Sequence, residues 1–82
     1  MELVVLRLFA SARDAAGTGR DDVAGDTVRD VLDAARERYG EPFRTLLESC
    51  AVWVNGEPCA LDDAVSDGDE VAVLPPVSGG AA

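Results

Sequence analysis

The end of the chain carries the residues whose types and spacing suit chemistry. Residues 75–82 are Pro-Pro-Val-Ser-Gly-Gly-Ala-Ala, with no bulky side chain after Val77. The proline pair fixes φ and favours an extended course, so we expect the tail to leave the last strand as an arm. Gly79 and Gly80 have no Cβ, and such a backbone passes through channels too narrow for other residues. The tail is therefore suited to deliver a carbonyl carbon into the active site of another protein.

Length and charge restrict the class of protein. With 82 residues the chain forms one domain, and no window resembles a signal peptide or approaches the ~20 apolar residues of a membrane span, so we expect a cytoplasmic protein. Sixteen acidic residues against seven basic ones give a net charge of -9. This charge disfavours nucleic acid and anionic membranes as partners and favours a protein with a basic surface. All basic residues are Arg, so the chain offers no lysine for a Schiff base or an isopeptide bond.

The two cysteines are predicted to be packing residues. Cys50 and Cys59 flank a predicted hairpin, and in a reducing cytosol such residues are more often small core hydrophobes than a redox pair. The chain has no His, no closely spaced thiol pair and no calcium-loop pattern. We therefore expect no metal and no cofactor bound by this chain.

The first half of the sequence predicts two strands and a helix. Residues 2–10 carry apolar side chains on both faces, which predicts a central strand buried on both sides. Residues 11–20 contain Gly17-Thr18-Gly19 and are expected to form a loop, and residues 21–24 a short second strand. Thr27 is a good N-cap for an amphipathic helix of about three turns that ends at Gly40.

The second half predicts a short helical turn and three strands. Residues 41–49 are expected to seal the core with one turn, and residues 51–54 form a strand that ends in Asn55-Gly56, a strong hairpin motif. Pro58 forces the returning strand to an edge of the sheet or to an irregular conformation. Trp53 is predicted to lie in the core or on the sheet surface, with a partner interface as the alternative. A connector at 61–65, a turn at 66–69 and a closing strand at 70–74 complete the chain.

This order of elements predicts an α+β fold. A strand pair, a crossing helix and further strands in so short a chain fit a mixed sheet packed around one main helix, the ubiquitin-like β-grasp arrangement. We expect residues 1–74 to form the β-grasp domain and residues 75–82 to form an extended C-terminal tail that carries the Gly-Gly motif.

Several segments together resemble a known family. A Gly-Gly pair by itself is typical of a flexible terminus, but here it follows other motifs in a specific order. The chain resembles the small, sulfur-carrying subunit of molybdopterin synthase, a member of the MoaD–ThiS family of ubiquitin-like sulfur carriers. The matching segments are Leu8-Phe9-Ala10, Arg13-Asp14-Ala15-Ala16-Gly17, Thr27-Val28-Arg29-Asp30-Val31-Leu32, Val54-Asn55-Gly56-Glu57 and residues 67–80.

The resemblance implies a reaction cycle in which the chain is a carrier rather than an enzyme. An E1-like adenylating enzyme uses ATP to activate the terminal glycine, and a sulfur donor converts the adenylate to a thiocarboxylate. The tail then enters the large subunit of molybdopterin synthase and donates sulfur for molybdenum cofactor biosynthesis. The reactive position would be Gly80, and Gly79 would give the tail clearance. The chain has no phosphate-binding glycine-rich loop with which to activate itself.

The sequence departs from the family after Gly80, because Ala81 and Ala82 follow where the reactive chain normally stops. We expect a C-terminal peptidase to remove both alanines before activation; otherwise the chain is inactive as a carrier or, least favoured, is activated at Ala82. Alternatives for the function are a sulfur carrier for thiamine or cysteine biosynthesis, a ubiquitin-like protein modifier, and a binding module whose blocked tail has no chemistry.

Overall fold

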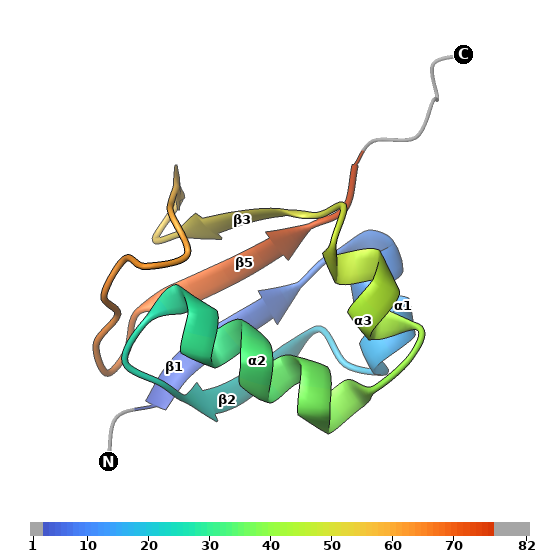
Figure 1. The fold of residues 1–82 in the computed structure, drawn as a ribbon, viewed down its shortest axis with the longest axis horizontal. Coiled ribbons are helices and arrows are strands. Elements are labelled where there is room, and N and C mark those ends of the chain that lie inside the picture. Colours follow the sequence, from blue (N-terminus) through green and yellow to red (C-terminus); the bar gives the residue numbers. More distant parts are fainter. Residues whose placement is uncertain (1–2, 77–82) are drawn as a thin grey trace.

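A five-stranded mixed sheet forms the centre of the fold (Figure 1). The computed structural model describes residues 3–76. The strand order is β2-β1-β5-β3-β4, with β1 and β5 parallel and the other neighbours antiparallel. This confirms the predicted mixed sheet, with Pro58 on the edge strand. The strands are β1 (Leu3–Leu8), β2 (Arg20–Ala24), β3 (Ala51–Val54), β4 (Glu57–Pro58) and β5 (Glu70–Leu74).

The main helix, α2 (Val28–Tyr39), crosses one face of the sheet (Figure 1). The Thr27 hydroxyl accepts a hydrogen bond from the Asp30 amide at 3.2 Å, which confirms the predicted N-cap. The connector after β4 satisfies two more amides of the first turn, because the carbonyls of Leu61 and Asp63 accept from Arg29 and Val28. The connector therefore holds the start of the helix against the sheet.

The core lies between the sheet and the helices. Alternate residues of the central strands point toward α2, and the short helix α3 (Phe43–Leu47) closes one end, as predicted. The ring of Phe43 meets the Tyr39 ring edge to face, with 5.1 Å between the ring centroids. The buried side chains are Val4, Leu6, Leu8, Ala12, Val23, Val28, Val31, Leu32, Ala35, Phe43, Leu47, Val65, Val71 and Val73.

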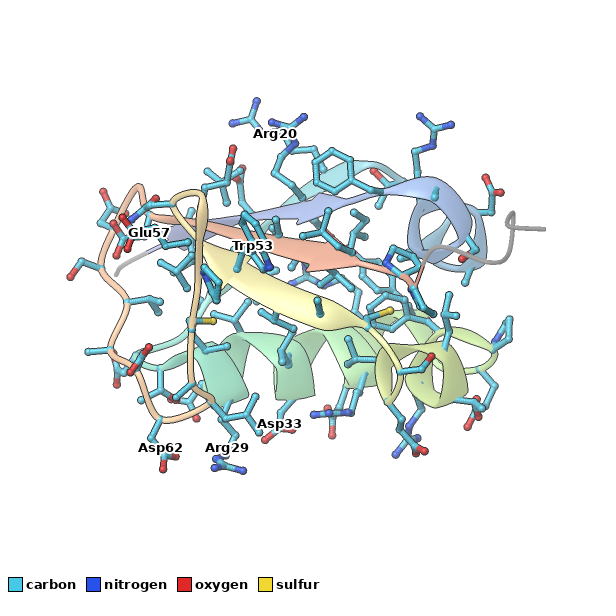
Figure 2. The ribbon with its side chains drawn as sticks, turned by 90° about the horizontal axis from the view of Figure 1, so that it is seen from above. Arg20, Arg29, Asp33, Trp53, Glu57 and Asp62 are labelled. Carbon is cyan, nitrogen blue, oxygen red and sulfur yellow. The ribbon has the colours of Figure 1, made fainter. Side chains whose placement is uncertain are left out.

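The prediction that β1 is buried on both sides is wrong. Val4, Leu6 and Leu8 are buried, but Leu3 is 41% exposed and Val5 is only half-buried. The reason is that the helices cover one face of the sheet and leave the other open (Figure 2). The apolar residues on the open face of β1 therefore do not belong to the core.

The prediction of a loop over residues 11–20 is also wrong in its first half, which forms a helix, α1 (Ala10–Ala16). Four of its seven residues are alanine, which has the highest helix propensity, and the Ala12 side chain is fully buried. Gly17 ends the helix with φ 83°, and its amide donates to the Arg13 carbonyl at 2.9 Å.

Local turn chemistry agrees with the sequence. Asn55 and Gly56 both have positive φ, 50° and 85°, as a two-residue type I′ hairpin between β3 and β4 requires. The Cys50 and Cys59 thiols are free and pack half-buried against the core, as expected. Burial raises the pKa of both thiols.

Candidate functional site

The tail begins at one defined end of the sheet. β5 ends at Leu74, beside the end of β1, because the two strands are parallel and Leu8 pairs with Val73. On the other side Leu74 pairs with Ala51 at the start of β3. Pro75 is half-buried against this end and Pro76 is exposed. The chain therefore leaves the sheet at the end of its central strand, between the end of β1 and the start of β3.

The predicted reactive residues, Gly79 and Gly80, lie outside the described residues. Their roles in the chemistry therefore stay predictions. The structure instead describes the end of the sheet at which Pro75 and Pro76 leave β5.

The open face of the sheet presents large apolar side chains beside the base of the tail. Trp53 on β3 is 38% exposed and lies between Ala72 of β5 and Pro58 of β4. Phe9, which follows β1, is 39% exposed, and its amide donates to the Val73 carbonyl at 3.3 Å. Figure 2 shows Trp53 on the side of the sheet away from α2. Exposed aromatic residues of this kind are typical of protein interfaces.

Arg7 adds a charged group to the open face. Its guanidinium carbon lies 5.6 Å from the centroid of the Phe9 ring, a cation–π contact, and its Nη1 lies 3.2 Å from the Glu70 carboxylate. The arginine therefore holds the exposed phenyl ring on the sheet.

The charged groups on the helix side bind one another instead. Tyr39 Oη and Arg38 Nη1 both donate to Asp21 Oδ2, at 2.6 and 2.7 Å. The hydrogen bond from Tyr39, followed by that from Arg38, lowers the pKa of Asp21. Burial, followed by the hydrogen bond to Asp21, raises the pKa of Tyr39. The cluster connects β2 to α2, and its role is structural.

The described residues bring together no group that activates a carboxylate. The raised pKa values keep the Cys50 and Cys59 thiols protonated, and a thiol is a weak nucleophile compared with a thiolate. Within residues 3–76 no cluster of three or more His, Cys, Asp or Glu side chains is placed to hold a metal ion. None of the helices in that part of the chain has the length and apolar character to cross a membrane.

Sequence reasoning missed the open apolar face and helix α1. The pattern did contain information about both: Leu3, Val5 and Phe9 recur on the face of β1 opposite the core, and residues 10–16 are rich in alanine. Apolar residues on both faces of a strand predict burial on both sides, because the sequence of the strand does not specify which of its faces the helices cover.

Comparisons with known proteins agree on one family. The model of the ThiS family matches residues 6–80, so the match includes both glycines of the tail and ends before Ala81. Small archaeal modifier protein 1 of Haloferax volcanii is 43% identical over 84 residues, covering 90% of this chain and 97% of that protein. The molybdopterin synthase sulfur carrier subunit of Escherichia coli is 31% identical over 83 residues, covering 95% of this chain and 100% of that protein.

Solved structures give the same result for the fold. The solution structure of small archaeal modifier protein 1 from Methanosarcina acetivorans has a TM-score of 0.86 and 32% identity, and 98% of each chain is covered. A chain in the BexX/CysO complex of Amycolatopsis orientalis has a TM-score of 0.79 and 26% identity, and 94% of this chain and 99% of that chain are covered. These neighbours confirm the predicted ubiquitin-like β-grasp fold.

Proposed function

The chain belongs to the ThiS family of ubiquitin-like sulfur carriers, and on this premise we propose that it carries sulfur as a thiocarboxylate at Gly80. The observation that carries the proposal is the extent of the family match, which runs through the core to residue 80. The fold supports it, because the central strand β5 ends at Leu74 and Pro76 is exposed beyond it.

The proposed cycle begins with exposure of the Gly80 carboxylate. A C-terminal peptidase hydrolyses the bond between Gly80 and Ala81. This step is needed because Gly80 within a peptide bond has no carboxylate oxygen to attack ATP. An E1-like adenylating enzyme then joins the carboxylate to AMP from ATP and releases pyrophosphate. Sulfide equivalents from a sulfur donor attack the acyl carbon, AMP leaves, and the thiocarboxylate forms. Because the cycle needs ATP and reduced sulfur, we place it in the cytoplasm.

Molybdopterin biosynthesis is the pathway that we propose for this carrier. The large subunit of molybdopterin synthase would then receive the tail and take its sulfur. The support is the similarity to the Escherichia coli sulfur carrier subunit, which extends over the full length of that protein. We propose that the open face, with Trp53 and Phe9, docks onto this subunit while the tail enters its active site.

A second candidate function is protein modification. It is favoured by the 43% identity to small archaeal modifier protein 1 of Haloferax volcanii. In this case a lysine amine of another protein attacks the activated Gly80 in place of sulfide, and an isopeptide bond forms. The two functions share the activation step and differ only in the attacking nucleophile.

Incubation with a cognate adenylating enzyme and ATP tests the shared step. We expect pyrophosphate release with a chain that ends at Gly80, none with the chain that retains Ala81 and Ala82, and strongly reduced release with a Gly80→Ala variant of the trimmed chain. Adenylation of the untrimmed chain would contradict the proposal. Intact mass after addition of sulfide then separates the candidates, because exchange of oxygen for sulfur indicates a carrier and a lysine adduct indicates a modifier.

A further inference from the structure

Three arginines surround one hollow near the base of the tail. The hollow has a volume of about 580 Å³ and lies between the end of β1, helix α1 and the start of β2. Such a concentration of positive charge is unexpected in a chain with a net charge of -9. The lining residues are Arg7, Leu8, Phe9, Arg13, Thr18, Gly19 and Arg20. We call this surface the arginine hollow.

Two of these arginines lack a carboxylate partner in the part of the chain that the structure describes. Arg13 and Arg20 form no ion pair there, whereas Arg7 pairs with Glu70. On the helix side, by contrast, the arginines at 29, 36 and 38 each lie within 2.8 Å of an aspartate oxygen. Positive charge in the arginine hollow is therefore available to an external group.

The register of the sheet places like charges opposite each other. Arg7 and Arg20 are direct partners in the antiparallel pair of β1 and β2. Two like charges in this position destabilise a sheet. Glu70 already pairs with Arg7, so Arg20 is the charge of this pair that an external anion can neutralise.

The backbone around the hollow is built to accommodate the arginine side chains. A Cβ at Gly19 would lie 3.0 Å from Arg13 Cδ, so glycine leaves the space in which the Arg13 stem packs. The Thr18 hydroxyl accepts from the Arg20 amide at 3.3 Å and donates to the Arg20 carbonyl at 2.9 Å, which fixes the turn before β2. Asp14 lines a smaller adjoining hollow on the other side of Arg13 and does not line this one.

The arginine hollow is continuous with the surface around the tail. Phe9 lines the hollow and donates its amide to Val73, one residue before the end of β5. Arg7 lines the hollow and also lies on the open face of the sheet. Figure 2 shows Arg20 on the same side of the sheet as Trp53, away from α2. A protein that receives the tail while it covers the open face therefore also reaches the hollow.

We propose that the arginine hollow binds clustered carboxylates in an acidic segment of the adenylating enzyme that accepts the tail for activation. Guanidinium groups pair with carboxylates through two parallel hydrogen bonds, which fixes orientation as well as affinity. The rest of the surface of this chain is mainly acidic and repels the acidic segment of the partner. The complex is therefore favoured when the partner is oriented with that segment in the arginine hollow. The identity of the tail-accepting protein rests on the proposed function, whereas the anion specificity of the hollow does not.

A peptide titration tests the hollow by itself. We expect hexaglutamate, added to the 15N-labelled full chain, to shift the amide resonances of residues 7–9, 13 and 18–20. The double variant Arg13→Gln/Arg20→Gln should weaken this binding about tenfold or more. The matched control, Arg36→Gln/Arg44→Gln, changes net charge equally but lies outside the hollow and should bind as the parent chain does. Absence of shifts at these residues, tighter binding of pyrophosphate at equal ionic strength, or equal losses in both double variants would overturn the proposal.

A second measurement uses the trimmed chain with the adenylating enzyme. Arg13→Gln/Arg20→Gln should raise the KM for the carrier about tenfold, and the control pair should change it less than twofold. The melting temperature of the hollow variant should not fall, because the substitution relieves the repulsion between Arg7 and Arg20. An unchanged KM would overturn the assignment of the acidic segment to this partner. Failure of the trimmed parent chain to be adenylated would instead overturn the proposed function and leave the peptide result intact.

Discussion

The two faces of the sheet use the same strands for different purposes. On the helix face, alternate residues of β1 and β5 are buried under α2 and α3 and form the core. On the open face, the residues between them leave Phe9 and Trp53 partly exposed toward the base of the tail, and Leu3 partly exposed at the opposite end of β1. Because strand side chains alternate between faces, neighbouring residues serve stability and recognition separately. Substitutions on one face should therefore affect folding, and substitutions on the other should affect binding.

The two sides of the sheet also differ in whether their arginines have carboxylate partners. The arginines around α2 form ion pairs with carboxylates of the same chain. Beside the open face, Arg7 and Arg20 are placed opposite each other across two strands. Charge on the helix side thus supports the fold, whereas charge in the arginine hollow is directed at a partner.

The largest expected effect is the loss of a core ring. Phe43→Ala removes a fully buried side chain and its contact with Tyr39, and should lower the free energy of unfolding by ~3–5 kcal/mol. Phe9→Ala removes an equal ring from the open face and should cost less than half as much, because that ring is already partly solvated. Urea denaturation of both variants measures the difference. Equal losses would contradict the distinction between the faces.

The next effect concerns binding without a loss of stability. Trp53→Ala should weaken binding to the synthase large subunit by about 2 kcal/mol or more, roughly 30-fold, while unfolding changes by less than ~1 kcal/mol. Leu61→Ala is the control, since Leu61 is similarly exposed but lies beside the start of α2. Calorimetric titration gives both affinities. If Leu61→Ala weakens binding as much as Trp53→Ala, the open face is not the docking surface.

A smaller effect, dependent on pH, is expected at Asp21. Asp21→Asn removes the carboxylate charge to which Tyr39 and Arg38 donate, and it should cost ~1–2 kcal/mol at neutral pH. The folded state lowers the pKa of Asp21, so its contribution is present above the pKa of an unfolded aspartate, about 3.9, and is lost as the pH falls through the folded value. Thermal unfolding from pH 7 to pH 2 should show the two proteins converging at the acid end. A constant difference at every pH would refute this account.

The smallest effect is expected for an exposed ion pair on the helix side. Asp33→Asn removes the negative charge of the carboxylate whose Oδ1 lies 2.6 Å from Arg36 Nη1, and it should cost at most ~0.5 kcal/mol, because solvent screens the pair. Binding of the tail-accepting partner should not change. A loss of affinity in this variant would extend the recognition surface to α2.

The sequence by itself determined the elements whose conformation depends on a few adjacent residues. Thr27 caps α2, Gly40 ends it, and Asn55-Gly56 forms the hairpin because each of these positions is decided by local backbone geometry and hydrogen bonding. The order of elements was sufficient to predict the mixed sheet. The tail motif indicated the candidate site, and residues 79 and 80 remain predictions because they lie outside the described residues.

Only the tertiary structure decided which surfaces are available. Helix α1 is short, and burial of Ala12 against the rest of the core stabilises it in a segment for which Gly17-Thr18-Gly19 indicated a loop. The open face exists because α2 crosses the sheet on one side only, which the apolar pattern of β1 does not specify. Arg7 and Arg20 meet through the register of two strands, and Arg13 joins them from α1. These contacts join residues that are distant in the chain, and therefore packing rather than local preference determines them.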